Sequence, residues 1–169
     1  RTEDEIKHIL VHLKQLGIEG DFTQYLKAIN YEKYNTLEPT ISQIYNLSHK
    51  LCSEYNSKDI SIRRRKEILD ALFPLQGKNL IVGDDIFVDC IGTVKIGNDV
   101  SIGIGSEVPN KMKPNIYSGG LATIGENSVI PGGVQIGKNT AISGITVKED
   151  YVQGALESGG VLIKAGDRS

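Results

Sequence analysis

The chain has 169 residues, of which 39% are hydrophobic and 24% are charged, and its net charge at pH 7 is −2. This length suits one or two domains, and the hydrophobic content is sufficient for a folded core. The nearly balanced charge disfavours nucleic acid and anionic membranes as partners. No apolar run approaches 18 residues and no signal-peptide pattern opens the sequence, so we expect a soluble, cytoplasmic protein.

Residues 1–74 have the pattern of a helical region. Glycine is scarce here, and apolar residues recur at the three- and four-residue intervals of amphipathic helices. Gly17 ends the first apolar stripe, Asp21 is a candidate cap of the second helix, and a third helix begins around Pro39. A fourth helix is predicted from about 60 to 73. The stripes of the first three helices are Ile6, Ile9, Leu10, Leu13 and Leu16; Phe22, Tyr25, Leu26 and Ile29; and Ile41, Ile44, Tyr45, Leu47, Ser48 and Leu51.

After Pro74 the sequence becomes rich in glycine and β-branched residues, and an apolar residue recurs at every sixth position. A helix cannot bury such a set, because six residues at about 100° each place successive members about 240° apart around its axis. Six-residue periodicity is a signature of the parallel β-helix, in which three short faces close one coil. We therefore predict a β-helix over residues 75–169. The period runs in three phases: Val82, Val88 and Val94; Ile96, Ile102 and Val108; and Ile124, Ile130, Ile136 and Ile142.

The six-residue period is interrupted at three places. A small insertion at Gly92–Thr93 separates the first two phases, and the segment from Pro109 to Gly120 separates the second from the third. The prolines and glycines of this longer segment cannot hold a strand, so we predict a loop that projects from the coils, where functional residues are often placed. After Val147 the repeat fades, and we expect an irregular cap in which Val161–Ile163 packs on the last coil.

The residue types and spacings predict neither a catalytic residue nor a metal site. All three histidines, His8, His12 and His49, lie in the helical region, and no Ser/His/Asp or Cys/His set is placed to form a nucleophilic site. His8 and His12 are four residues apart on one helical face, but no other cluster of ligand side chains completes a metal site. Cys52 and Cys90 lack CxxC spacing, so we expect two buried thiols.

Two groups of polar residues are candidate ligand contacts. The first lies in the predicted loop, and its lysines, amides and tyrosine suit phosphate groups or sugar hydroxyls. The second is a basic run at the start of the fourth helix that could bind a phosphate or a carboxylate. A solvated loop and a solvated helix face are the alternative interpretations. The two groups are Lys111, Lys113, Asn115 and Tyr117 in the loop, and Arg63, Arg64 and Arg65 in the helix.

The second half of the chain resembles the C-terminal left-handed β-helix of bacterial sugar-1-phosphate nucleotidyltransferases of the glucose-1-phosphate adenylyltransferase type. The resemblance is carried by VPNKMKPNIYSGGLATIGENSVIPGGVQIGKNTAISG, which begins at Val108, and by the later LESGG. It implies left-handed coils and, in that family, a role in subunit assembly and in effector control of some members. Because the sequence begins with Arg1 and its single methionine is Met112, we expect a fragment of a longer protein.

The middle of the chain, from Tyr45 to Gly103, resembles the sugar O-acetyltransferases of the maltose and galactoside type. The resembling segments are KLCSEYN, RRRKEILDALF, GKNLIV and DCIGTVKIGNDVSIG. This resemblance implies acetyl-CoA as a cofactor, bound along the prism between subunits, and a histidine on a coil that deprotonates the acceptor. The sequence has no histidine after His49, and it also lacks the glycine-rich nucleotide-binding domain that a nucleotidyltransferase needs for catalysis.

Together these observations predict an α+β protein, a helical region at 1–74 followed by a short left-handed parallel β-helix at 75–169. The main functional hypothesis is the assembly and regulatory part of a sugar-1-phosphate nucleotidyltransferase that binds a sugar phosphate or nucleotide-sugar. An acetyl-CoA-dependent sugar O-acetyltransferase and a non-catalytic structural module are the alternatives. Flat β-helix faces favour packing against copies of the same chain, so we expect a trimer or dimer.

Overall fold

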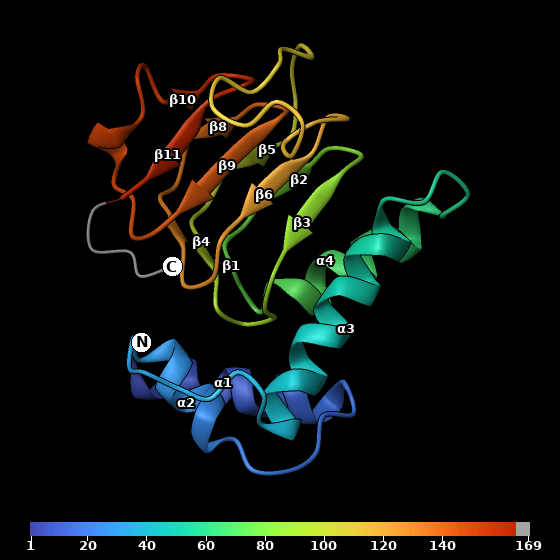
Figure 1. The fold of residues 1–169 in the computed structure, drawn as a ribbon, viewed down its shortest axis with the longest axis vertical. Helices are drawn as coiled ribbons and strands as arrows, with labels where there is room; N and C mark the ends of the chain where they lie inside the picture. The colour runs from blue at the N-terminus through green and yellow to red at the C-terminus, as the bar shows by residue number, and fades with distance from the viewer. Residues whose placement is uncertain (165–169) are drawn as a thin grey trace.

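The computed structural model describes residues 1–164, in which a helical region adjoins a β-helix (Figure 1). The last helix ends at Leu72 and the first strand begins at Leu75, on either side of Pro74. The helices are α1 (Glu3–Gln15), α2 (Thr23–Ile29), α3 (Pro39–Tyr55), α4 (Ile62–Leu72) and the short 3₁₀ helix η1 (Lys148–Asp150). The strands are β1 (Leu75–Gln76), β2 (Ile81–Val82), β3 (Ile86–Val88), β4 (Lys95–Ile96), β5 (Ser101–Ile102), β6 (Ala122–Ile124), β7 (Val129–Ile130), β8 (Gln135–Ile136), β9 (Thr140–Ser143), β10 (Ala155–Leu156) and β11 (Val161–Ile163).

Side-chain caps define where three of the helices begin. Thr2 and Glu5 form a reciprocal capping box at α1, and Ser61 accepts a hydrogen bond from the first turn of α4. At α3 the two carboxylate oxygens of Glu38 accept hydrogen bonds from the backbone amides of its first turn. The prediction that Asp21 caps the second helix was wrong by one position, because Phe22 holds that place and Asp21 forms a local turn with Thr23 instead.

The strands form three parallel sheets in which each strand pairs with the strand of the neighbouring coil. The first sheet has the order β1-β4-β7, the second β10-β8-β5-β2 and the third β11-β9-β6-β3. Within the described residues the chain therefore completes three coils and adds two strands of a fourth. The predicted combination of helices and parallel sheets is confirmed.

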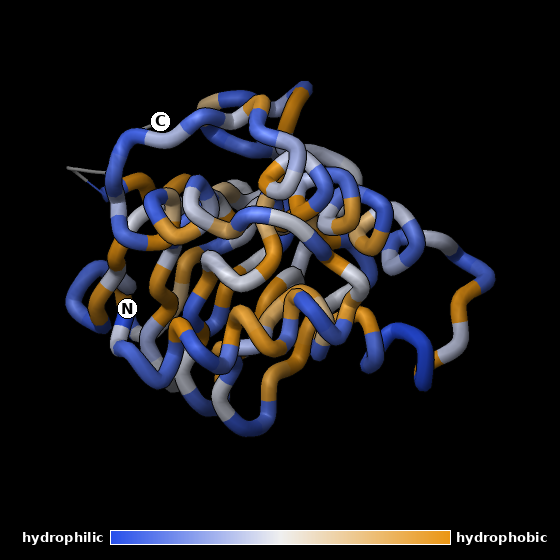
Figure 2. Tube along the Cα trace, turned by 90° about the horizontal axis from the view of Figure 1, so that it is seen from below, coloured by the Kyte–Doolittle hydropathy of each residue, from blue (hydrophilic) through white to orange (hydrophobic). Residues whose placement is uncertain are grey.

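The six-residue period sets which side chains point into the prism. In the third sheet Val88 pairs with Ile124, Ile124 with Ile142, and Ile142 with Leu162, so one inward row crosses four coils. Figure 2 shows short hydrophobic stretches alternating with hydrophilic ones along the trace. Val108 departs from the prediction and is 41% exposed, because the chain leaves the coil after Gly103 and Val108 already belongs to the loop.

The segment after Val147 is more regular than the sequence predicted. Instead of an irregular cap, it forms η1 and then β10 and β11, which extend the second and third sheets. Leu156 and Leu162 are six residues apart and pair with the inward residues Ile136 and Ile142. The insertion around η1 shifts the phase of the repeat, and this shift hid the fourth coil in the sequence.

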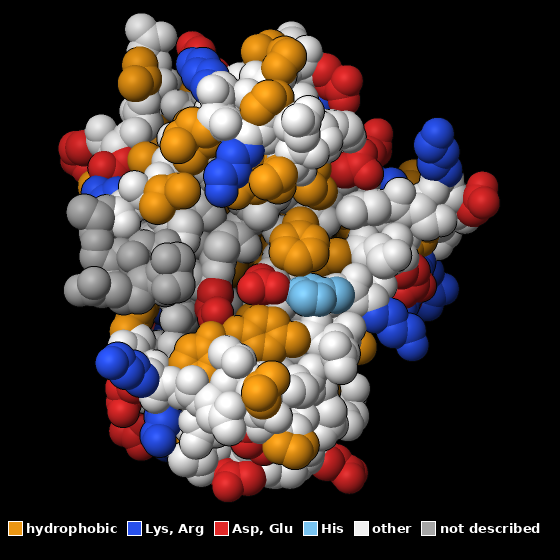
Figure 3. Space-filling view, viewed as in Figure 1, with side chains coloured by type: hydrophobic (Ala, Val, Ile, Leu, Met, Phe, Trp, Pro, Cys, Tyr) orange, Lys and Arg blue, Asp and Glu red, His pale blue; other side chains and the backbone are white. Residues whose placement is uncertain are grey.

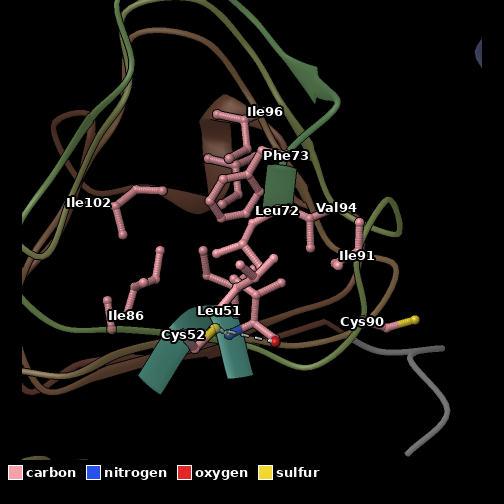
Figure 4. Packing of buried hydrophobic residues seen from close by; sticks show 14 of the residues in the cluster. Leu51, Cys52, Leu72, Phe73, Ile86, Cys90, Ile91, Val94, Ile96 and Ile102 are labelled. Atoms are coloured by element: carbon pink, nitrogen blue, oxygen red, sulfur yellow. Dashed lines mark hydrogen bonds between the residues drawn. The ribbon is translucent and has the colours of Figure 1, made fainter. Parts of the chain in front are cut away.

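The helical region packs onto the first coil through one continuous hydrophobic core. Figure 4 shows Leu51 and Phe73 pointing into the same space as Ile96 of the second coil. Buried hydrogen bonds accompany this packing: the Ser48 hydroxyl donates to the carbonyl oxygen of Val88 at 2.6 Å, and Asn56 exchanges two hydrogen bonds with the backbone of Ile86. The helices therefore cover the strands at which the β-helix begins.

Both cysteines are buried and free, as predicted. Burial raises the pKa of Cys52 to about 11 and raises the pKa of Cys90 well above its usual value, so both thiols stay protonated at neutral pH. In the part of the chain that the structure describes, no helix has both the length and the apolar run needed to cross a membrane.

The hydrogen bond between Tyr25 and Ile91 ties α2 to the first coil and provides a test of this packing. Tyr25 is fully buried, and its hydroxyl donates to the carbonyl oxygen of Ile91 at 2.9 Å. Tyr25→Phe removes this partner from a buried carbonyl, so we expect the free energy of unfolding in a urea titration to fall by about 1–3 kcal/mol.

Tyr31→Phe is the matched control for this substitution. Tyr31 is 53% exposed, and its hydroxyl lies 3.4 Å from the carbonyl oxygen of Asn127. Its loss should therefore change the free energy of unfolding by less than about 0.5 kcal/mol. Equal decreases in the free energy of unfolding for the two variants would contradict the role assigned to Tyr25.

Candidate functional site

A group of polar and aromatic side chains gathers where the helical region meets the outer surface of the third sheet. Tyr45 and His49 lie one turn apart on α3, whereas Phe87 belongs to β3 and points outward between the buried Ile86 and Val88. We call this group the junction face. It consists of Tyr34, Tyr45, His49, Phe87, Asp89 and Glu126.

The fold explains why residues far apart in the sequence meet at the junction face. Strands β3 and β6 are neighbours in the third sheet, with Phe87 paired to Thr123 and Val88 paired to Ile124. Asp89 follows the end of β3, and Glu126 follows the end of β6 by two residues, so both carboxylates leave the sheet at the same end. Helix α3 packs on β3 and brings its side chains to this end.

His49 and Asp89 form a hydrogen-bonded pair at the centre of the junction face. Nε2 of His49 lies 2.8 Å from Oδ1 of Asp89, and the side chains are 45% and 42% exposed, so solvent reaches both. The imidazole ring lies 5.2 Å from the Phe87 ring, centroid to centroid, and 6.3 Å from the Tyr45 ring. The carboxylate and the two aromatic rings together orient the imidazole.

Two tyrosines and a glutamate form a second hydrogen-bonded group beside this pair. The Tyr34 hydroxyl lies 2.8 Å and 2.9 Å from the two carboxylate oxygens of Glu126 and 2.8 Å from the Tyr45 hydroxyl, which itself donates to Glu126 at 2.9 Å. Burial, with a further contribution from Glu126, raises the pKa of Tyr34 to about 12. Burial, the bond to Tyr34 and the charge of Glu126 raise the pKa of Tyr45 further.

The space-filling view supports this description. Figure 3 shows a histidine flanked by acidic and aromatic side chains in the indentation between the two lobes of the molecule. Among the described residues, no three His, Cys, Asp or Glu side chains approach closely enough to hold a metal ion. The junction face therefore offers hydrogen-bond donors, acceptors and aromatic surface.

The predicted loop between β5 and β6 is held at both ends by two buried asparagines. Asn110 donates to the carbonyl oxygen of Asn139 at 2.8 Å and accepts hydrogen bonds from the amides of Met112 and Lys113. Asn139 accepts from the amide of Gly120 at 2.8 Å and donates to the carbonyl oxygen of Val108 at 3.0 Å. The loop therefore projects from a fixed base.

The loop residues predicted as ligand contacts lie on this projection. Lys111, Lys113 and Asn115 are exposed, and Tyr117 is half-buried. Beside the loop is a shallow depression of about 190 Å³, lined by Gly83, Asp84, Gly103, Ile104, Gly105 and Lys138. Asp85 follows Asp84, one of the lining residues, in the sequence. Its burial and the charge of Asp84 raise the pKa of Asp85.

The predicted arginine contacts are engaged within the helical region. Arg64 makes two hydrogen bonds to Glu54, at 2.7 Å and 2.8 Å, and Arg65 pairs with Asp84 and stacks over Tyr55. Arg63 is highly exposed and lies 3.6 Å from Glu67. Figure 1 shows α4 at the side of the molecule and the loop at its upper end, so the structure does not bring the two predicted groups together.

The remaining histidines have structural partners. Nε2 of His8 lies 3.1 Å from the carbonyl oxygen of Pro74, and Nε2 of His12 lies 2.8 Å from that of Ala71. Both rings therefore attach α1 to the end of α4. The junction face was missed from the sequence, because its members come from four segments with no common spacing. Only the outward place of Phe87 in its strand was available as a signal.

Comparison with curated sequences relates part of the chain to one group of transferases. No family model matches the chain. It is 57% identical over 65 residues to a glucose-1-phosphate adenylyltransferase of Lachnospira eligens, and this alignment covers 38% of this chain and 15% of the relative. It is 35% identical over 104 residues to the glucose-1-phosphate adenylyltransferase of Acetivibrio thermocellus, and this alignment covers 60% of this chain and 24% of the relative. The chain thus spans less than a quarter of the length of these curated relatives.

Structural comparison gives matches of low score. A maltose O-acetyltransferase from Clostridium difficile 630 has a TM-score of 0.38 and 17% sequence identity, and the match covers 86% of this chain and 95% of that one. A hexapeptide-repeat acetyltransferase from Vibrio cholerae, solved with acetyl coenzyme A, has a TM-score of 0.33. The resemblance to glucose-1-phosphate adenylyltransferases that the sequence indicated is confirmed.

The raised pKa of Tyr34 predicts how the protein responds to alkaline pH. In the unfolded chain a tyrosine loses its proton near pH 10, whereas folded Tyr34 keeps it until about pH 12. The folded state therefore holds more protons in this interval, and the stability contributed by Tyr34 is lost as the pH rises from about 10 to 12.

An absorbance titration at 295 nm measures this effect directly. The difference between the wild-type protein and Tyr34→Phe isolates the titration of this phenol, and we expect its midpoint near pH 12 in the folded protein. The same difference measured in urea should move to about pH 10. A midpoint near 10 in the folded protein would show that Tyr34 is not buried against Glu126.

Proposed function

We propose that the chain is the assembly and regulatory β-helix part of a sugar-1-phosphate nucleotidyltransferase, located in the cytoplasm. The observation that carries this proposal is the 57% identity to a glucose-1-phosphate adenylyltransferase over 65 residues, in a chain whose second half is a stack of parallel coils. The coils are proposed to be left-handed, as the sequence resemblance implies. Residues 1–74 and 75–169 are proposed as its two domains.

The surface of the β-helix supports a role in assembly. Exposed hydrophobic side chains gather on the loop and around the last coil, and Figure 3 shows hydrophobic side chains at this end of the molecule. Within the described residues β10 and β11 pair on one side only, which leaves backbone groups at a sheet edge. Such features favour contact with another copy in a dimer or trimer. The exposed side chains are Ile104, Val108, Met112 and Ile116 on the loop, and Ile145, Val147, Val152 and Ile163 around the last coil.

A sugar phosphate or nucleotide-sugar is the proposed effector, and the loop is its proposed contact. Lys111 and Lys113 are exposed cations on a loop whose base is fixed by Asn110, so they are available to a phosphate at little conformational cost. Asn115 and Tyr117 add polar groups beside them. The run Arg63 to Arg65 is a weaker candidate, since the guanidinium groups of Arg64 and Arg65 already have acidic partners.

A sugar O-acetyltransferase that uses acetyl-CoA is the second candidate, and one observation favours it. Although the β-helix contains no histidine, α3 places His49 against its outer surface, paired with Asp89. An imidazole paired with a carboxylate is the arrangement of a general base. Thermal stabilisation by acetyl-CoA and not by sugar phosphates would favour this candidate over the first. A non-catalytic structural module would respond to neither ligand.

The assembly role predicts a stable oligomer. Size-exclusion chromatography with light scattering should give two or three times the 18.4 kDa mass of one chain. Met112→Glu combined with Ile116→Glu should shift this mass toward that of a single chain, because it places charges in the proposed contact.

Leu37→Glu is the matched control for the assembly experiment. Leu37 is 85% exposed in the helical region, away from the loop, so its substitution should leave the mass unchanged. A clean monomer across a wide range of concentrations in the wild-type protein would overturn the assembly role.

A further inference from the structure

We propose that the outer edge of β3 is a docking site for the last coil of a second copy of this chain, and that α3 closes this site by taking the place of a strand. The inference goes beyond the proposed function, because it concerns open-ended stacking through the first coil and not a closed dimer or trimer. It rests on three observations: α3 pairs with the edge of β3, the last coil leaves an edge unpaired, and the two edges match in register.

Helix α3 pairs with β3 as a neighbouring strand would. The side-chain amide of Asn56 accepts a hydrogen bond from the amide of Ile86 at 2.9 Å and donates to its carbonyl oxygen at 3.1 Å, so it replaces a peptide group. At Val88 the Ser48 hydroxyl donates to the carbonyl oxygen at 2.6 Å, and Sγ of Cys52 accepts from the amide at 3.4 Å. Both amides and both carbonyl groups that β3 presents at this edge therefore have partners on α3.

The helix brings these three side chains to one edge because they are spaced four residues apart and lie one above another on one face. The same face covers the next strand edge, since the Tyr55 hydroxyl donates to the carbonyl oxygens of Val82 and Gly83 at 3.2 Å and 2.7 Å. An uncovered sheet edge is a template for another strand, and a helix laid over the edge prevents such pairing. Helix α3 thus occupies the position that a coil before the first one would take.

The opposite edge of the third sheet has no such cover within the described residues, where β11 is the last strand. The carbonyl oxygen of Gly160 and the amide of Lys164 bond to β9. Along a strand the backbone polar groups of successive residues alternate between its two neighbours. The amides and carbonyl groups of Val161 and Ile163 therefore point away from β9, toward the open edge.

The two edges match in register. The inward row of the third sheet begins at Val88 on the first coil and ends at Leu162 on the last. Val88 of a second copy placed over Leu162 continues this row, and the outward backbone groups of the two strands then face each other. The amide of Ile163 would donate to the carbonyl oxygen of Val88, which Ser48 satisfies in the closed chain. The last coil of a second copy is therefore the partner that fits.

This contact joins two different surfaces of the chain, so it repeats without closing and produces a filament. Because α3 and β3 belong to one chain, their contact is intramolecular and is favoured over contact with a second copy. The docking site opens only when α3 leaves the edge of β3. The helical region therefore determines whether the coils can stack end to end.

Ser48→Ala combined with Asn56→Leu tests the inference in the complete 169-residue chain. The double variant removes the hydrogen bonds of these two side chains to β3 and places apolar groups of about the same size there. We expect the mass measured by light scattering to rise at least about tenfold above that of the wild-type protein, because the contact does not close. Electron micrographs should show unbranched filaments, with a diffraction spacing of about 4.8 Å along the axis.

Tyr25→Phe is the matched control. It also removes a buried hydrogen bond of the helical region, but the partner is the carbonyl oxygen of Ile91, outside the edge of β3. Its mass should equal that of the wild-type protein at the same concentration. Circular dichroism and the melting temperature show whether each variant is folded, and Asn56→Leu alone is measured in the same way if the double variant does not fold.

A further substitution tests the other partner of the contact. Ile163→Pro, added to the double variant, removes the amide that would donate to Val88, and proline is tolerated where an edge strand turns its nitrogen to solvent. This substitution should return the mass to that of the wild-type protein. Ile163→Val keeps the amide and should leave the filaments in place.

Three results would overturn the inference. These are an unchanged mass in the folded α3 variants, a rise in mass that Ile163→Pro does not reverse, and an equal rise in Tyr25→Phe. The mass of the wild-type oligomer is measured independently of these variants. If the wild-type protein is a dimer or trimer and the α3 variants do not grow, this inference alone fails. If the wild-type protein is a monomer and the variants grow into filaments, the assembly role alone fails.

Discussion

The structure depends on one constraint: each short strand of the β-helix can satisfy its backbone hydrogen bonds only through the coil next to it. Strands of two to four residues have no stability of their own, so every coil must stack in register on its neighbour. This register aligns Val88, Ile124, Ile142 and Leu162 into one inward row. It also leaves the first coil in need of a cover, which the packed helices provide.

The sequence predicted the features that repeat and missed those that arise where the repeat is broken. The isoleucines at 124, 130, 136 and 142 indicated the coils, since their spacing reflects the stacking constraint itself. Val108 lies on the same six-residue grid, but the chain had already left the coil, and spacing cannot distinguish these cases. Leu156 and Leu162 were missed for the opposite reason, because η1 shifts their phase.

The candidate site shows the same limit in a stronger form. The loop lysines were recognisable, because a segment that interrupts a repeat is visible in the sequence. The contact of His49 with Asp89 joins residues 40 positions apart, and it exists only because α3 packs on β3. The resemblance to acetyltransferases implied a histidine on a coil, and the sequence has no histidine after His49. The helical region instead places His49 at the outer surface of the third sheet. The helices that cover the first coil thus also create the junction face.

The central claim is that the helical region and the β-helix form one folded unit, in which the helices cover the first coil. Hydrogen exchange of backbone amides under increasing urea tests it most directly. If the claim is correct, amides in the middle of α3 and in β3 and β6 become exposed in the same global unfolding, with equal free energies and equal dependence on urea. Amides of α3 that exchange at much lower urea than those of β3 would contradict it, because the helices would then open while the coils remain folded.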